Sequence, residues 1–90
     1  MKVKIKDSLG KDFQITCDES KTIKSIIDEY KTLSGNTNKT VKNFTASYNG
    51  DTFNYDDDVC KTTTLKNLEF EDGEQIVIAF AYDGGKNIFN

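Results

Sequence analysis

The chain has 90 residues, which is the length of one small domain with a single core. Its net charge of −3 and a pI close to 4.8 argue against a dedicated nucleic-acid-binding protein. The sequence contains no apolar segment long enough to span a bilayer and no signal-peptide core, so we expect a cytoplasmic protein with no membrane partner.

The first 17 residues predict a β-hairpin. Apolar residues alternate with lysines over residues 1–6, and apolar and polar residues alternate again over residues 12–17, which is the period of a half-buried strand. The intervening loop contains Gly10, a residue suited to a positive φ. Four lysines line this hairpin, and they are either a solvated face or a candidate binding surface: Lys2, Lys4, Lys6 and Lys11.

The period then changes to that of a helix. Thr22 is the expected N-cap, with its hydroxyl accepting from the backbone N–H of Lys24 or Ser25, and Gly35 suits the left-handed residue that ends a helix. A helix this short is marginal in water by itself, so we expect it to pack on a sheet. Its apolar stripe is formed by Ile23, Ile26, Ile27, Tyr30 and Leu33.

A second hairpin follows a polar stretch. Residues 36–43 have no periodicity and predict a loop, whereas residues 44–48 alternate like a strand. Asn49-Gly50 is a strong hairpin signal, and it leads into a short fourth strand over residues 52–55. The next three residues, 56–58, are all aspartates; they lack the alternating spacing of a calcium loop, and we interpret them as a solvated loop.

The last predicted strand covers residues 75–82 and is the longest apolar run in the sequence. Its bulky residues lie on one face and its small ones on the other, which is typical of a strand in the middle of a sheet. A buried helix is the alternative, but the acidic Gly-containing turns on both sides favour the strand. Before it, residues 64–68 predict a short helical turn whose leucines, with Phe70, fill the core.

The sequence lacks the residue combinations that most catalytic sites use. The chain has no His, and its two cysteines are far apart and form no metal or redox motif. Cys17 is expected to be a small buried hydrophobe and Cys60 a loop thiol with no candidate base nearby. We therefore predict no metal site, no cofactor and no enzymatic activity.

The order of elements resembles that of ubiquitin-like proteins. The similarity at the start lies in residues 1–6, in the Gly10-Lys11 turn and in Thr22-Ile23 and Gly35 at the helix ends. Near the other end it lies in Thr64-Leu65, the acidic Gly turn, the final strand and Gly84-Gly85, while the middle is longer than in ubiquitin. The resemblance implies an α+β, β-grasp fold: a mixed sheet of four to five strands with one crossing helix. The domain would cover residues 1–83, and residues 84–90 would be a Gly-Gly and short C-terminal tail.

The resemblance implies three possible functions, of which the first is a protein modifier. Conjugating members of the family end in Gly-Gly, so the chain would be a modifier precursor processed after Gly85 and joined to targets through that glycine, with an activating enzyme and a processing protease as partners. Ala81 and Asp83 replace the basic residues that precede the glycines in the family, and the positions of the ubiquitin hydrophobic patch hold Ser8, Ser47 and Ala79.

These departures favour the second function, a monomeric, non-conjugated interaction protein whose partners are other proteins. In that case residues 83–86 form a tight turn, and Ile88 and Phe89 return to cover apolar surface. A sulfur carrier, which uses its terminal glycine as a thiocarboxylate, is a third function of this fold, but such proteins usually end at that glycine.

Overall fold

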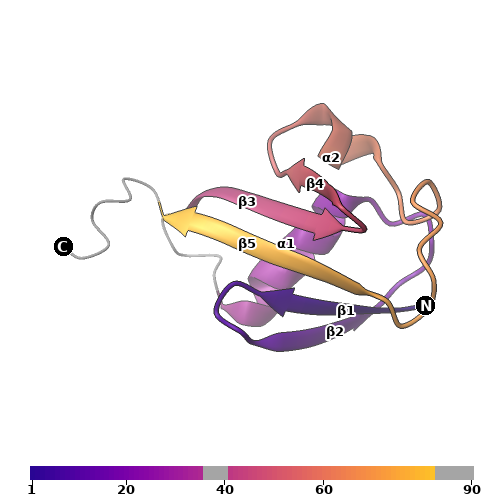
Figure 1. Ribbon diagram of the computed structural model, residues 1–90, viewed down its shortest axis with the longest axis horizontal. Helices are drawn as coiled ribbons and strands as arrows, with labels where there is room; N and C mark the ends of the chain where they lie inside the picture. The colour runs from indigo at the N-terminus through magenta and orange to yellow at the C-terminus, as the bar shows by residue number, and fades with distance from the viewer. Residues whose placement is uncertain (36–40, 83–90) are drawn as a thin grey trace.

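The computed structural model describes residues 1–35 and 41–82 (Figure 1). The expected Gly84-Gly85 tail, most of the predicted 36–43 loop and the turn over residues 83–86 lie outside these ranges. Within them are five strands, β1 (Lys2–Asp7), β2 (Asp12–Thr16), β3 (Val41–Tyr48), β4 (Asp51–Asn54) and β5 (Gln75–Tyr82), and two helices, α1 (Ile23–Ser34) and α2 (Asp58–Thr62). Neither helix is long and apolar enough to cross a bilayer in this part of the chain.

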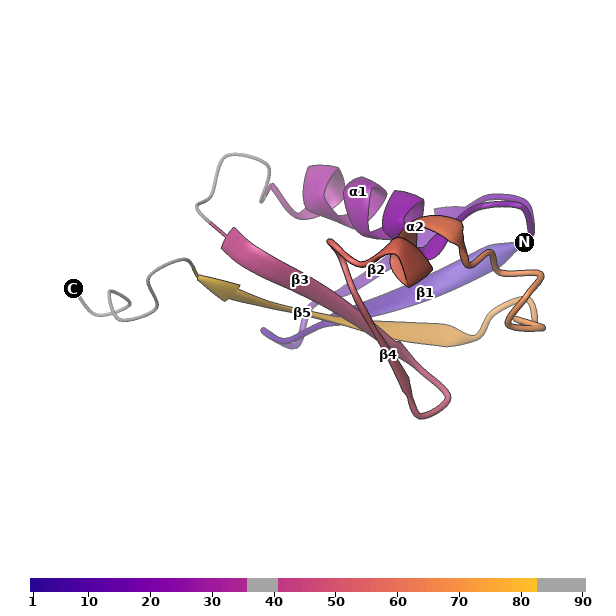
Figure 2. The same cartoon turned by 90° about the horizontal axis from the view of Figure 1, so that it is seen from above.

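The strands form one mixed sheet in the order β2-β1-β5-β3-β4. β5 lies at its centre, as predicted: it runs parallel to β1, with Ile5 opposite Ile76, and antiparallel to β3, with Ala46 opposite Ile78. Because parallel neighbours need a long crossover, α1 connects the two halves across one face of the sheet. Figure 2 shows α1 on one side of the sheet, and no described helix or strand covers the opposite face.

The core lies between α1 and the sheet. Ile76 and Ile78 on β5 and Val3 and Ile5 on β1 are at most 1% exposed, and each fully buried side chain of this size contributes roughly 1.5–3 kcal/mol. The remaining buried apolar residues are Ile15, Ile23, Ile26, Ile27, Tyr30, Phe44, Ala46, Phe53, Cys60, Leu65 and Phe70.

Helix α1 has the predicted ends. The Thr22 side chain accepts from the backbone N–H of Ser25 at 3.2 Å, and Gly35 adopts a left-handed conformation with φ 76°. The prediction that Leu33 belongs to the buried stripe is wrong, since it is 52% exposed. It lies on the flank of the stripe in the last turn before Gly35, so the stripe effectively ends at Tyr30.

The second hairpin differs from the prediction at its start. β3 begins at Val41, and Val41 and Asn43 pair with Tyr82 and Ala81 of β5, although residues 36–43 were expected to be a loop. Backbone pairing with the central strand, together with a register irregularity between Val41 and Asn43, extends the strand into a polar sequence that has no period of its own. The turn is as predicted, with positive φ at both Asn49 and Gly50.

The segment between β4 and β5 contains a helix that the sequence did not predict. α2 begins at Asp58 with Asp57 in the N-cap position, so the three aspartates start a helix and are not simply a loop. Cys60 lies in this helix and is 0% exposed, so its assignment as a loop thiol is also wrong. Residues 65–69 form the predicted short turn, in which the Leu68 N–H bonds to the Thr64 carbonyl at 3.3 Å. Leu65 and Phe70 fill the core as expected, and Leu68 packs half-buried against it.

Candidate functional site

The candidate site is the open face of the sheet, which we define as the face opposite α1. Strand alternation places Lys2, Lys4 and Lys6 of β1 on this face, and all three are exposed. In Figure 1 the open face is turned toward the viewer and α1 lies behind the sheet. The structure therefore brings three of the four predicted binding residues together.

Side chains on the open face lie in rows that cross the strands. One row runs through Gln14, Lys4 and Gln75, since Lys4 is the register partner of both glutamines. The next row contains Asp12, Lys6, Val77, Ser47 and Thr52. Lys6 and Asp12 form an ion pair with a nitrogen–oxygen distance of 3.7 Å, and the Ser47 and Thr52 hydroxyls are 3.4 Å apart.

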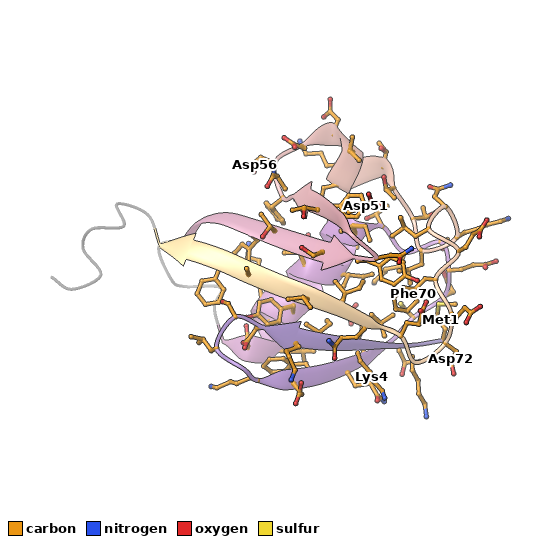
Figure 3. The ribbon with its side chains drawn as sticks, viewed as in Figure 1. Met1, Lys4, Asp51, Asp56, Phe70 and Asp72 are labelled. Atoms are coloured by element: carbon orange, nitrogen blue, oxygen red, sulfur yellow. The ribbon has the colours of Figure 1, made fainter. Side chains whose placement is uncertain are left out.

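A shallow pocket opens at the first of these rows. It has a volume of about 330 Å³ and draws its lining from three neighbouring strands: Lys4, Ile5, Asp12, Phe13, Gln14 and Gln75. Figure 3 labels Lys4 on β1, next to β2. Among the lysines of the predicted surface, Lys4 is the one that this pocket contains.

Asp7 holds the end of the lysine-bearing strand in place. Its side chain is 4% exposed, and it accepts hydrogen bonds from the backbone N–H groups of Leu9 and Lys11 at 3.0 and 2.8 Å and from the Tyr30 hydroxyl at 2.9 Å. Burial alone raises the pKa of Asp7, but these hydrogen bonds outweigh it and leave the pKa below its usual value. Lys11, the fourth predicted binding residue, lies in the β1–β2 turn, where its backbone N–H bonds to Asp7, and it is not part of the rows of side chains on the open face.

The carboxylates near the pocket are engaged by other groups. Asp12 pairs with Lys6, and Asp72 accepts from the backbone N–H of Lys2 at 2.5 Å. Glu74 accepts from the Tyr48 hydroxyl and from the backbone N–H of Glu71, and the first of these contacts raises the pKa of Tyr48 to about 12. No ion pair involves Lys4 within residues 1–35 and 41–82.

Neither thiol is set up as a nucleophile. Burial raises the pKa of Cys60 to about 11 and also raises that of Cys17, which is half-buried beside the end of β2. At neutral pH both groups are protonated. In the described part of the chain, no group of three or more His, Cys, Asp or Glu side chains is placed to hold a metal ion.

The arrangement can be compared with known proteins. No protein-family model matches the sequence, and no curated protein matches it. Among solved structures, the ubiquitin of Caldiarchaeum subterraneum is similar with a TM-score of 0.71 at 21% identity, over 94% of this chain and 98% of that one. The chain has the ubiquitin-like β-grasp fold. At this identity the similarity is one of fold.

The residues that the sequence resemblance places at the ubiquitin hydrophobic patch are polar or small. Ser8 is exposed, and Ser47 and Ala79 are half-buried on the open face. Two apolar residues that the sequence pattern did not single out are exposed: Val77, between Lys6 and Ser47 on the open face, at 41%, and Leu9, in the β1–β2 turn, at 64%. The sequence could have indicated that Val77 is exposed, because in the alternation of β5 it lies on the face opposite Ile76 and Ile78.

Proposed function

We propose that this chain is a monomeric, cytoplasmic, ubiquitin-like interaction protein that binds other proteins through its surface and catalyses no reaction. The observation that supports this most directly is the open face of the sheet. It is uncovered by any described element and carries Lys2, Lys4 and Lys6, with only Val77 and Ala79 as apolar residues among those described. A ubiquitin-like domain with such a face would recognise a polar or acidic partner rather than an apolar one.

The second proposal is a modifier precursor processed after Gly85 and conjugated through that glycine, with an activating enzyme and a processing protease as its partners. It is supported by the similarity to the structure of the Caldiarchaeum subterraneum ubiquitin and by Gly84-Gly85 following the central strand in the sequence. It is weakened by Asp83, a carboxylate where ubiquitin-like modifiers carry cations, and by the polar residues at the hydrophobic-patch positions.

The two proposals differ in what residues 84–90 are needed for. We would express the full chain and a version ending at Asp83 in the native cells and compare the proteins that each one captures. An interaction protein retains the same partners in both versions, and they are released by denaturant. Loss of every partner on truncation, or partners that stay attached under denaturing conditions, would instead support the modifier.

A further inference from the structure

The pocket around Lys4 has the chemistry of a carboxylate site. Lys4 stands between Gln14 and Gln75 in the register of the sheet, and all three residues line the pocket. Ammonium and amide N–H groups all donate hydrogen bonds, and a carboxylate accepts from several donors at once.

Among the described residues, the carboxylates around Lys4 leave its ammonium group available. Asp12 also lines the pocket, but it forms an ion pair with Lys6 at 3.7 Å. Glu74 precedes Gln75, and its carboxylate accepts from the Tyr48 hydroxyl and the Glu71 N–H. Its backbone carbonyl accepts from the N–H of Lys4 at 3.0 Å, which fixes the strand without using the ammonium.

The spacing of the lysines adds a second feature. Lys2, Lys4 and Lys6 are alternate residues of one strand, so they stand about 7 Å apart along β1. An extended peptide has the same rise per residue, and its alternate side chains point to one side. A segment with acidic residues at every second position can therefore place successive carboxylates over successive lysines.

We propose that the open face binds an extended acidic segment of a partner protein, with carboxylates on alternate residues and the middle one seated in the Gln14–Lys4–Gln75 pocket. This inference rests on the proposed interaction function and names the chemistry of its partner. Within residues 1–35 and 41–82 the Lys4 ammonium forms no ion pair and lines the pocket, whereas Lys6 shares its charge with Asp12. Lys2 is held beside Asp72 through its backbone N–H. The flanking lysines attract the segment, and the pocket fixes its register.

The test uses the full chain and a capped synthetic peptide in which glutamate and threonine alternate over six residues. Backbone amide shifts are followed by NMR during titration at low salt. We expect the shifts to concentrate in β1, β2 and the start of β5, and the affinity to fall as the salt is raised to about 0.15 M. A peptide with glutamine in place of glutamate should not bind.

The matched variants are Lys4→Gln and Lys61→Gln, which remove the same charge from the pocket and from exposed α2. We expect Lys4→Gln to weaken binding about three- to fivefold, as for an exposed ion pair, and Lys61→Gln to leave it nearly unchanged. Equal affinities for the two variants, shifts outside the open face, or equal binding of a peptide with three consecutive glutamates would overturn the proposal. Because truncation and partner capture test the interaction function without any acidic peptide, a failure here leaves that function standing.

Discussion

Asp7 is the buried carboxylate on which the first hairpin depends. It satisfies two backbone N–H groups of the β1–β2 turn and the hydroxyl of Tyr30, so it joins the turn to helix α1. Removing one partner of such a group leaves a buried polar atom unsatisfied, which costs more than the bond itself contributes. Asp7 therefore anchors the end of β1, the strand that carries Lys2, Lys4 and Lys6.

Replacing Asp7 with Asn should destabilise the protein by about 1.5–3 kcal/mol at pH 7, because the amide nitrogen cannot accept the Tyr30 hydrogen bond. The pKa of Asp7 is lowered in the folded state, so its contribution is present above the usual carboxyl pKa and is lost as the pH falls through the folded value. The difference between wild type and variant should thus shrink below about pH 4. Urea unfolding at pH 7 and pH 2.5 measures this difference in the free energy of unfolding. Asp12→Asn, at an exposed position, is the control. An equal difference in unfolding free energy between wild type and variant at both pH values would contradict the role given to Asp7.

Cys60 should react with a thiol reagent only when the protein unfolds. It is fully buried and its pKa is raised to about 11, so the reactive thiolate is scarce and inaccessible. Cys17 is half-buried and should be modified first. Timed labelling with and without denaturant, followed by peptide mass mapping, distinguishes the two. Rapid labelling of Cys60 in the native protein would restore the loop-thiol assignment.

A helix or strand could be predicted from the sequence where the spacing of its apolar residues and its cap or turn residues indicate the same structure. The alternation in β1, β2 and β5 and the stripe of α1 gave the correct types of structure, and Thr22, Gly35 and Asn49-Gly50 gave correct ends and turns. α2 was not predictable, because a five-residue helix with one buried side chain, Cys60, has no period to detect. The start of β3 was missed because pairing with β5, and not its own residues, makes it a strand.

The boundary of the α1 stripe can be tested with two alanine substitutions. Ile27→Ala should cost about 2–5 kcal/mol, since the side chain is fully buried between helix and sheet. Leu33→Ala should cost less than about 0.5 kcal/mol, because Leu33 is 52% exposed and alanine is the better helix former. Equilibrium unfolding of both variants measures the contrast. A large cost at Leu33 would mean that the stripe extends to the helix end after all.

At the scale of the whole molecule, the fold follows from joining the first and last strands at the centre of the sheet. β5 has apolar residues on its core face, and β1 offers a matching row, so the parallel pair brings together segments about 70 residues apart. The sequence also predicted that Lys2, Lys4 and Lys6 lie on one exposed face, because alternate residues of a strand point to the same side. It could not locate the pocket, which depends on the register that places Gln14 and Gln75 beside Lys4. Register is set by packing of the whole sheet.

The measurement that tests the central claim most directly is the covalent fate of the chain in its native cells. The chain would carry one tag before Met1 and another after Asn90, and it would be recovered under denaturing conditions. An interaction protein keeps both tags and shows no species of higher mass. Loss of the second tag at Gly85, together with covalent adducts of the remainder, would contradict the account and establish a modifier.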